Sequence, residues 1–290
     1  MQLRAIAIMI RRLVIAGGVA ALSAGMIPAS LAAASADAPP SDSATPRDAF
    51  VEIAPGHIEY YSTADVLKQG KPIAPPRLSV QFDEPLHFMK RHVSQAEYAA
   101  CVQDGGCRQL DKAQRADVAA DLPVVGVSWQ DATDYAAWLS KRTGHQYRLP
   151  TYDEWVHAAG EAFTEDLRLD IYDSDNPSDR WLAEYALEAQ RKIATDPSPK
   201  PFGTYGTNAA GVHDINGNVW DWTDTCYSRV FLGPDGEASL PPFENCGVRV
   251  VAGSHHSMIT DFMRDPKAGA CSVGIPPANL GIRLVRVSKG

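Results

Sequence analysis

PVVGVSWQDATDYAAWLSKRTGH, residues 123–145, carries the strongest local folding signal in this chain of 290 residues. Ser128 and Asp131 form an S-x-x-D capping box, which is typical of a helix N-terminus. Apolar residues then repeat at helical spacing, and Gly144 can end the helix in the left-handed conformation. The pattern predicts a helix that begins after Ser128 and ends at Gly144.

Two further capping boxes lie on either side of this segment. Thr151 and Glu154 form one of them directly after Pro150, and Ser94 and Glu97 form the other. Each box precedes an apolar-periodic stretch, so helices are expected to begin at both places.

The rest of the sequence is typical of short strands and turns within one domain. Residues 50–88 contain brief apolar runs separated by proline and glycine, and further strand candidates lie at 248–251 and 282–287. Residues 161–200 are acidic and polar and are expected to form a surface insertion with one helix around Trp181. We assign a single domain to residues 49–290.

Residues 1–36 have the composition of a secretory signal peptide. They contain three arginines, no acidic residue and a mostly apolar run from Leu13 to Ala33. A single-pass anchor is the alternative, but glycines and a proline interrupt the run, which favours cleavage. Arg11 and Arg12 permit twin-arginine export beside the Sec route, so we expect a periplasmic or secreted protein.

The composition after the leader excludes several classes of partner. Residues 37–48 are poor in apolar side chains and are expected to be a flexible linker. Removing three of the 27 basic residues leaves 24 against 35 acidic ones, a net charge of −11, which disfavours nucleic acid as a partner. No later segment has the ~18 apolar residues of a membrane span.

Five cysteines remain in the domain, and export makes disulfides the default interpretation. Cys101 and Cys107 bracket a turn-forming Asp-Gly-Gly, which can bring them within bonding distance. Cys226 and Cys246 form the second expected pair, which leaves Cys271 over. Spacing alone leaves a Cys246–Cys271 pairing open.

Five sequence blocks, taken in order, resemble the sulfatase-modifying factor family, which includes the formylglycine-generating enzymes. The resemblance spans roughly residues 50–288 and implies an α+β fold related to C-type lectins, with little regular secondary structure. The blocks are PVVGVSWQDATDYAAWL (123–139), YRLPTYDEW (147–155), GTNAAGVHDINGNVWDW (206–222), VVAGS (250–254) and NLGIRLVR (279–286).

The third block contains a candidate calcium site. Asp214 and Asp221 are interleaved with Gly217 and Val219, and calcium prefers such carboxylate and carbonyl oxygens. The resemblance implies a structural calcium held by these two side chains and two carbonyls. An ordinary turn with solvated carboxylates is the alternative.

The fourth block departs from the family pattern. In formylglycine-generating enzymes two cysteines five residues apart bind copper and oxidise a cysteine of a client sulfatase. Here AGSHHSMITDFMR (252–264) places Ser257 and Phe262 at those positions. Neither side chain can replace a thiolate, so formylglycine generation is not expected.

Polar residues around these positions are the candidate catalytic residues. Adjacent histidines in an extended segment point to opposite faces, so one at most is expected to enter a pocket. A copper or iron ion bound by one of them, with His213, Asp261 or Cys271, is an alternative to surface histidines. Asp261 and Arg264 suit an acid–base pair or a structural ion pair, and Cys271 is either an inert or a reactive thiol. The candidates are His255, His256, Ser257, Asp261, Arg264 and Cys271.

Within the family, the chain is most similar to exported members: proteins encoded with copper nitrite reductases and tailoring proteins of pyoverdine assembly. The resemblance implies a maturation or oxidative tailoring factor for a periplasmic protein or peptide, such as a copper nitrite reductase. A non-catalytic, calcium-stabilised binding module is the alternative from another class. A true formylglycine-generating oxidase is a third hypothesis.

Overall fold

The computed structural model describes residues 49–111, 119–165, 198–264 and 279–288, together with 176, 178–179, 181–183 and 185–186. The expected signal peptide, the linker and Cys271 lie outside the described residues. Among the helices that are described, none combines the length and the apolar character that a membrane crossing requires.

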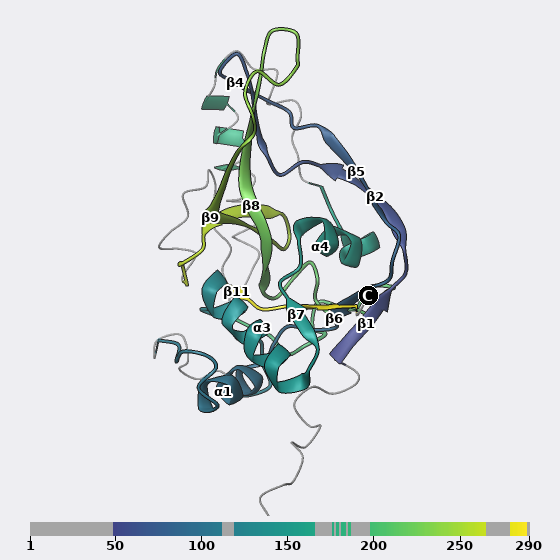
Figure 1. The fold of residues 1–290 in the computed structure, drawn as a ribbon, viewed down its shortest axis with the longest axis vertical. Helices are drawn as coiled ribbons and strands as arrows, with labels where there is room; N and C mark the ends of the chain where they lie inside the picture. Colours follow the sequence, from purple (N-terminus) through teal and green to yellow (C-terminus); the bar gives the residue numbers. More distant parts are fainter. Residues whose placement is uncertain are drawn as a thin grey trace, which may run out of the picture. The chain divides into compact units, whose positions relative to one another are not determined.

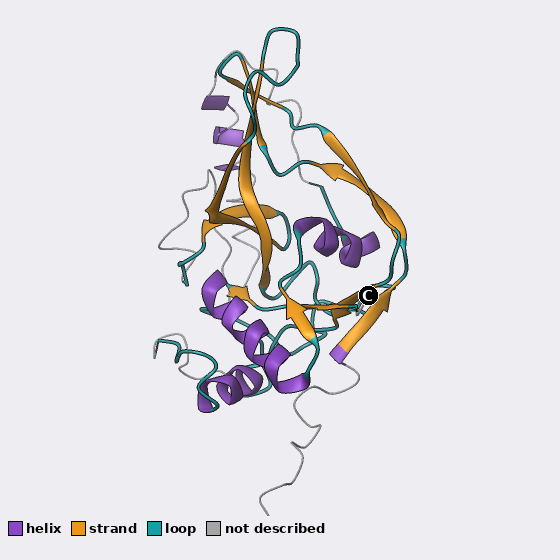
Figure 2. Ribbon diagram, viewed as in Figure 1, coloured by secondary structure: helices purple, strands orange, loops and turns teal. Residues whose placement is uncertain are grey.

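The described strands form three sheets (Figures 1 and 2). One sheet has the order β1-β6-β12-β7, a larger one has the order β10-β9-β8-β3-β4 with β11 beside β8, and β2 pairs with β5. The larger sheet therefore ends at β10, which pairs with β9 alone among the described strands. The bounds are β1 Phe50–Ile53, β2 Gly56–Tyr61, β3 Asp65–Lys68, β4 Lys71–Ile73, β5 Arg77–Phe82, β6 Leu86–Met89, β7 Gln146–Arg148, β8 Trp220–Leu232, β9 Phe243–Ala252, β10 His256–Thr260, β11 Leu280–Gly281 and β12 Val285–Val287.

The helices begin where the sequence predicts them. They are α1 (Gln95–Gln103), α3 (Trp129–Thr143) and α4 (Tyr152–Ala159), and the short 3-10 helix η2 (Gly160–Ala162) follows α4. All three predicted capping boxes are formed, each with both reciprocal hydrogen bonds. Gly144 ends α3 at φ 73°, a conformation that favours glycine.

The largest difference from the sequence expectation is β8. Only short strands were expected after residue 200, whereas β8 runs for 13 residues. Its threonines, valine and aromatic residues suit an extended strand, and pairing with β9 stabilises it along this length. The strand predicted at 248–251 is confirmed, since it falls within the longer strand β9. The strand predicted at 282–287 is confirmed only at its end, which forms β12.

Two hydrophobic clusters hold these elements together. One packs α1 and α3 against the strands through side chains that include Leu139 and Trp222, and the other surrounds Trp155 of α4 and Phe88 of β6. All four side chains are at most 1% exposed. Burying a side chain of this size stabilises the fold by roughly 1.5–3 kcal/mol.

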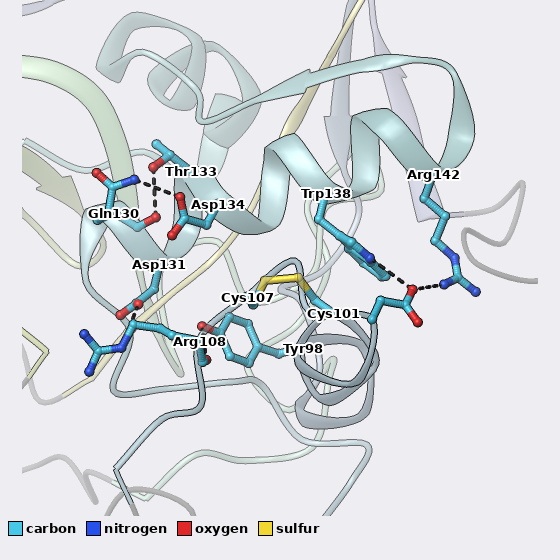
Figure 3. Close-up of a disulfide and its surroundings, with 11 residues drawn as sticks. Tyr98, Cys101, Cys107, Arg108, Gln130, Asp131, Thr133, Asp134, Trp138 and Arg142 are labelled. Atoms are coloured by element: carbon cyan, nitrogen blue, oxygen red, sulfur yellow. Dashed lines mark hydrogen bonds and ion pairs between the residues drawn. A yellow bond between two sulfur atoms is a disulfide. The ribbon is translucent and has the colours of Figure 1, made fainter.

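Both expected disulfides are formed. Cys101, in α1, is bonded to Cys107 across a Cα–Cα distance of 5.2 Å, and Figure 3 shows this bond close to Trp138 of α3. Cys226 of β8 is bonded to Cys246 of β9, with a Cα–Cα distance of 4.5 Å. The alternative pairing of Cys246 with Cys271 is therefore not adopted.

Candidate functional site

Most of the candidate catalytic residues that the structure describes lie on or beside β10. His256 and Ser257 begin the strand, and Asp261 follows its last residue. The strand is antiparallel to β9, with Ser257 opposite Val251 and Thr260 opposite Val248. Ser257 is buried, at 9% exposure.

The two adjacent histidines contact different aromatic rings. The His255 ring lies edge-on to Trp220 at 4.5 Å between centroids, and the His256 ring lies edge-on to Tyr152 at 5.8 Å. The Trp220 ring is itself fixed, since it lies so close to Gly253 that a Cβ there would be 2.6 Å from it. The histidines thus have different neighbours, as expected for adjacent residues in an extended segment.

Arg264 forms a structural ion pair, but not with Asp261. Its guanidinium donates to both carboxylate oxygens of Asp131, at 2.7 and 2.9 Å. Asp131 is completely buried and also accepts hydrogen bonds from the backbone and hydroxyl of Ser128. The hydrogen bond to Asp131 raises the pKa of Arg264 above its usual value. Arg264 therefore fixes the start of α3, and the sequence-based pairing of Asp261 with Arg264 is wrong.

The backbone of Asp261 connects α3 to the end of the larger sheet. Its N–H donates to the Gly247 carbonyl at 3.0 Å, and its carbonyl accepts from the Trp129 N–H at 2.9 Å. The next residue, Phe262, is 64% exposed and is one of several large apolar side chains at the surface of the described structure. Asp261 and Phe262 are thus held beside β9 and α3 on a fixed backbone.

Sequence reasoning missed Arg249, which organises this end of the sheet. Its guanidinium lies 3.9 Å from the centroid of the Trp129 ring and donates to the carboxylate of Asp224 at 3.0 Å. The same Nη1 atom lies 3.3 Å from the sulfur of Cys226. No local motif marks an arginine inside a strand, so the sequence carried no signal for this role.

Three buried polar atoms in this region lack a hydrogen-bond partner within the described part of the protein. They belong to Trp129 (Nε1), Arg249 (Nε) and Thr260 (Oγ1). Polar atoms that are buried without a partner are uncommon, and a binding or catalytic role is one explanation for them. Trp129 and Arg249 are in contact, and Thr260 directly precedes Asp261. This end of the sheet is the candidate functional site.

A second polar cluster is completely buried and centres on Asp221. Its carboxylate accepts from Trp155 at 2.9 Å, from Arg283 at 3.2 Å and from His92 at 3.0 Å. Burial opposes ionisation of Asp221, but Arg283 and His92 outweigh it and lower its pKa to about 2. Burial and Arg283 lower the pKa of His92, so this histidine is neutral.

Comparison with known proteins identifies the family. The sulfatase-modifying factor enzyme 1-like domain matches residues 35–288. The chain belongs to this family. A formylglycine-generating enzyme of Streptomyces coelicolor is 29% identical over 168 residues, which cover 56% of this chain and 51% of that protein. An inactive C-alpha-formylglycine-generating enzyme 2 of Mus musculus is 30% identical over 112 residues, 37% of this chain and 33% of that protein.

Further matches agree on the fold. A hercynine oxygenase of Mycobacterium tuberculosis is 34% identical over 110 residues, 37% of this chain and 23% of that protein. The solved structure of PvdO from Pseudomonas aeruginosa superposes with a TM-score of 0.53 at 22% identity, covering 82% of this chain and 94% of that one. The chain spans about half the length, or less, of the curated relatives named here. The match to PvdO supports the α+β fold of the family that the sequence predicts.

Asp221 does not fit the calcium site that the family resemblance implies. Its oxygens already accept from an arginine, a histidine and a tryptophan, and a cation beside the Arg283 guanidinium would be repelled. The Asp214 oxygens accept backbone N–H groups of Gly203 and Tyr205 at 2.6 and 2.7 Å. Both carboxylates are buried, so they are not the solvated carboxylates of the alternative interpretation.

Proposed function

We propose that this chain is an exported maturation or tailoring factor that does not use the copper-dependent chemistry of formylglycine-generating enzymes. The observation that carries the proposal is the pair of residues at the family's cysteine positions, Ser257 and Phe262. Cu(I) prefers soft sulfur ligands, and neither a hydroxyl nor a phenyl ring supplies one. Ser257 is also buried, so it is poorly placed to meet a substrate.

The site proposed for the partner is the end of the larger sheet. Exposed Phe262 offers apolar surface, Asp261 offers a carboxylate, and Arg249 lies beside Trp129 with an unpartnered N–H. An exposed aromatic residue next to charged groups is typical of a protein or peptide interface. We include His255 and His256 at the other end of β10 as residues that contact the partner.

The partner we propose is an exported redox protein such as a copper nitrite reductase. The basic and apolar leader supports export, and the two disulfides are typical of an oxidising compartment. The relatives include a formylglycine-generating enzyme and a hercynine oxygenase, which supports a tailoring role over a purely structural one.

Co-production with the nitrite reductase tests this function. The reductase is purified from cells with this protein, without it, and with a Phe262→Ala/Asp261→Asn variant, and its intact mass and copper content are compared. We expect a mass change or a gain of copper with the wild-type protein, reduced by the variant. A reductase of identical mass and copper content in all three preparations would contradict the proposal.

The non-catalytic binding module is a second candidate, favoured by a specific observation. Arg264 is tied to Asp131, and both histidine rings pack on aromatic side chains, so several candidate catalytic groups have structural contacts. A binder forms a complex with the partner in size-exclusion chromatography and leaves its mass unchanged, whereas a tailoring factor changes the mass.

A further inference from the structure

The Cys226–Cys246 disulfide lies in an irregular part of the β8–β9 pairing. Cys226 is opposite Arg249, but the next residue, Tyr227, is opposite Asn245. Residues 246–248 therefore have no partner on β8, and such irregularities of strand pairing are common beside active sites. Cys246 is exposed and Cys226 is partly exposed, so solvent reaches this bond.

The two sulfur atoms differ in the charged group that lies nearest to each. Both sulfurs lie within 4.8 Å of a Glu244 carboxylate oxygen, and the Arg249 guanidinium also pairs with Asp224. The Arg249 guanidinium lies 3.3 Å from the Cys226 sulfur, whereas a carboxylate oxygen of Glu244 lies 3.5 Å from the Cys246 sulfur. A positive group stabilises a thiolate and a negative group destabilises it. Cys226 is thus the better leaving group when the bond is broken, and Cys246 is the more accessible sulfur for an attacking thiol.

We propose that Cys226–Cys246 is a redox-active disulfide that exchanges with a thiol of an exported partner protein or peptide. The partner thiolate attacks the Cys246 sulfur, a mixed disulfide forms, and the electron pair of the broken bond stays on Cys226 beside Arg249. A second partner thiolate then attacks the partner sulfur of the mixed disulfide and releases Cys246 as a thiolate. The partner is oxidised to a disulfide, and the Cys226–Cys246 pair is reduced by two electrons.

The position of the disulfide suits a macromolecular partner. Gly247, next to Cys246, bonds to the Asp261 backbone, so the disulfide lies beside the Asp261–Phe262 segment. Glu244 disfavours an approaching thiolate, but it is exposed, and solvent and salt screen its charge. The inference rests on the proposed function for its exported partner, whereas exchange with glutathione tests the reactivity of the disulfide separately.

The second disulfide provides a control within the same molecule. Cys101 is completely buried and Cys107 is 8% exposed, and both belong to a hydrophobic cluster. A thiol has little access to this bond, so it should persist when Cys226–Cys246 reacts.

Exchange with reduced glutathione tests the proposal on the wild-type protein. Native protein is incubated with the thiol and quenched with acid and N-ethylmaleimide, and each cysteine is assigned by peptide mass spectrometry. We expect glutathione on Cys246 and maleimide on Cys226, with Cys101–Cys107 intact. The proposal is overturned if both disulfides react equally slowly, or if glutathione is found on Cys226 instead of Cys246.

Arg249 acts as a positioning residue, and its variants test the electrostatic part of the proposal. Arg249→Gln should slow the exchange roughly threefold, because the leaving thiolate loses its positive neighbour, and Arg249→Lys should restore most of the rate. Arg229→Gln, which removes an arginine of β8 that pairs with Asp65, should leave the rate unchanged. Equal rates in wild type and Arg249→Gln would contradict the role assigned to Arg249.

A pH profile separates this role from a structural one. In a Cys246→Ser/Cys271→Ser background the Cys226 thiol is free, and its alkylation should reach half-maximal rate below the pH of about 8.5 that is usual for a cysteine. Adding Arg249→Gln should move this midpoint to higher pH, whereas a purely structural arginine would leave it in place.

Discussion

Asp221 is held by three N–H donors that come from parts of the chain far apart in sequence. Trp155 and Arg283 donate to it, and one tautomer of His92 completes the set: Nε2–H donates to Asp221 while Nδ1 accepts from Arg283. A neutral His92 can donate to Asp221 and accept from Arg283 at the same time. A protonated His92 would instead point an N–H donor at the positively charged guanidinium, which also carries only donors. No local sequence pattern could name His92 or Asp221 as partners of Arg283, because the three residues lie far apart in the chain.

Replacing the Asp221 carboxylate should be strongly destabilising. Asp221→Asn leaves the Arg283 charge buried without a counter-ion, so the free energy of unfolding should fall by about 3–5 kcal/mol. Asp104→Asn is the matched control, because it removes an exposed carboxylate that pairs with the exposed Arg142 and should cost at most about 1 kcal/mol. Urea unfolding of both variants checks this, and equal losses would show that Asp221 is not the centre of the cluster.

The same cluster predicts how stability depends on pH. The pKa of His92 is lowered in the folded protein, so the unfolded chain takes up the proton first and stability is lost as the pH falls below about 6.5. Asp221, with a pKa of about 2, contributes fully above its ordinary value near 3.8, and this contribution is lost as the pH falls towards 2.

Unfolding by urea at pH 7.5 and 5.5 measures the histidine contribution. The free energy of unfolding should be lower at pH 5.5, and His92→Gln should reduce the difference between the two values. His213 also has a lowered pKa, so part of the difference should persist. A wild-type protein that gains stability on acidification, or a variant with an unchanged difference, would show that His92 is not buried in the neutral form.

At the scale of elements, the N-terminus of α3 joins the helix to the candidate site. Asp131 closes the capping box with Ser128, and the same carboxylate holds Arg264 just beyond β10. The capping boxes were predictable because all of their partners lie within four residues of one another. The Arg264 partner was not, because Asp131 comes close only through tertiary folding.

Loss of the N-cap of α3 should therefore destabilise the protein more than loss of the N-cap of α4. Ser128→Ala should lower the free energy of unfolding by about 2 kcal/mol, which is at the upper end of the range for loss of an N-cap. The cost is high because the substitution also removes the hydrogen bond that the Ser128 hydroxyl donates to buried Asp131. Thr151→Ala removes the equivalent cap of α4 and should cost about 1 kcal/mol, because its partner Glu154 keeps the ion pair with Arg148. Thermal and urea unfolding check the order, and a larger loss for Thr151→Ala would contradict it.

At the scale of the whole molecule, composition and ordered blocks predicted the family, the α+β class and both disulfides. The sheet order was not predictable, because β3 pairs with β8 and β1 with β6 across long stretches of chain. The candidate residues from His255 to Asp261 lie on or beside one strand because they are adjacent in sequence, and their role as a site stays a prediction. The contact between Arg249 and Trp129 at the candidate site depends on the packing of β9 against α3, and no sequence pattern predicted that packing.

The effect of calcium on the stability of the whole molecule can be measured directly. Because Asp221 is engaged by Arg283 and His92, we expect EGTA to leave the thermal unfolding midpoint within about 1 °C of the untreated protein, as for a change well under 1 kcal/mol. A drop of several degrees that Asp214→Ala abolishes would instead establish the calcium site that the family resemblance implies.

The central claim is that sulfur is missing from the positions where this family holds copper. Purified protein with its disulfides intact is supplied with Cu(I) and a sulfatase-derived cysteine peptide, and the peptide is analysed by mass spectrometry for conversion of cysteine to an aldehyde. A Ser257→Cys/Phe262→Cys variant, which restores the thiols, is run beside it and checked for bound copper. We predict no aldehyde and no stoichiometric copper with the wild-type protein, and copper bound by the variant. Aldehyde formed by the wild-type protein would contradict the claim.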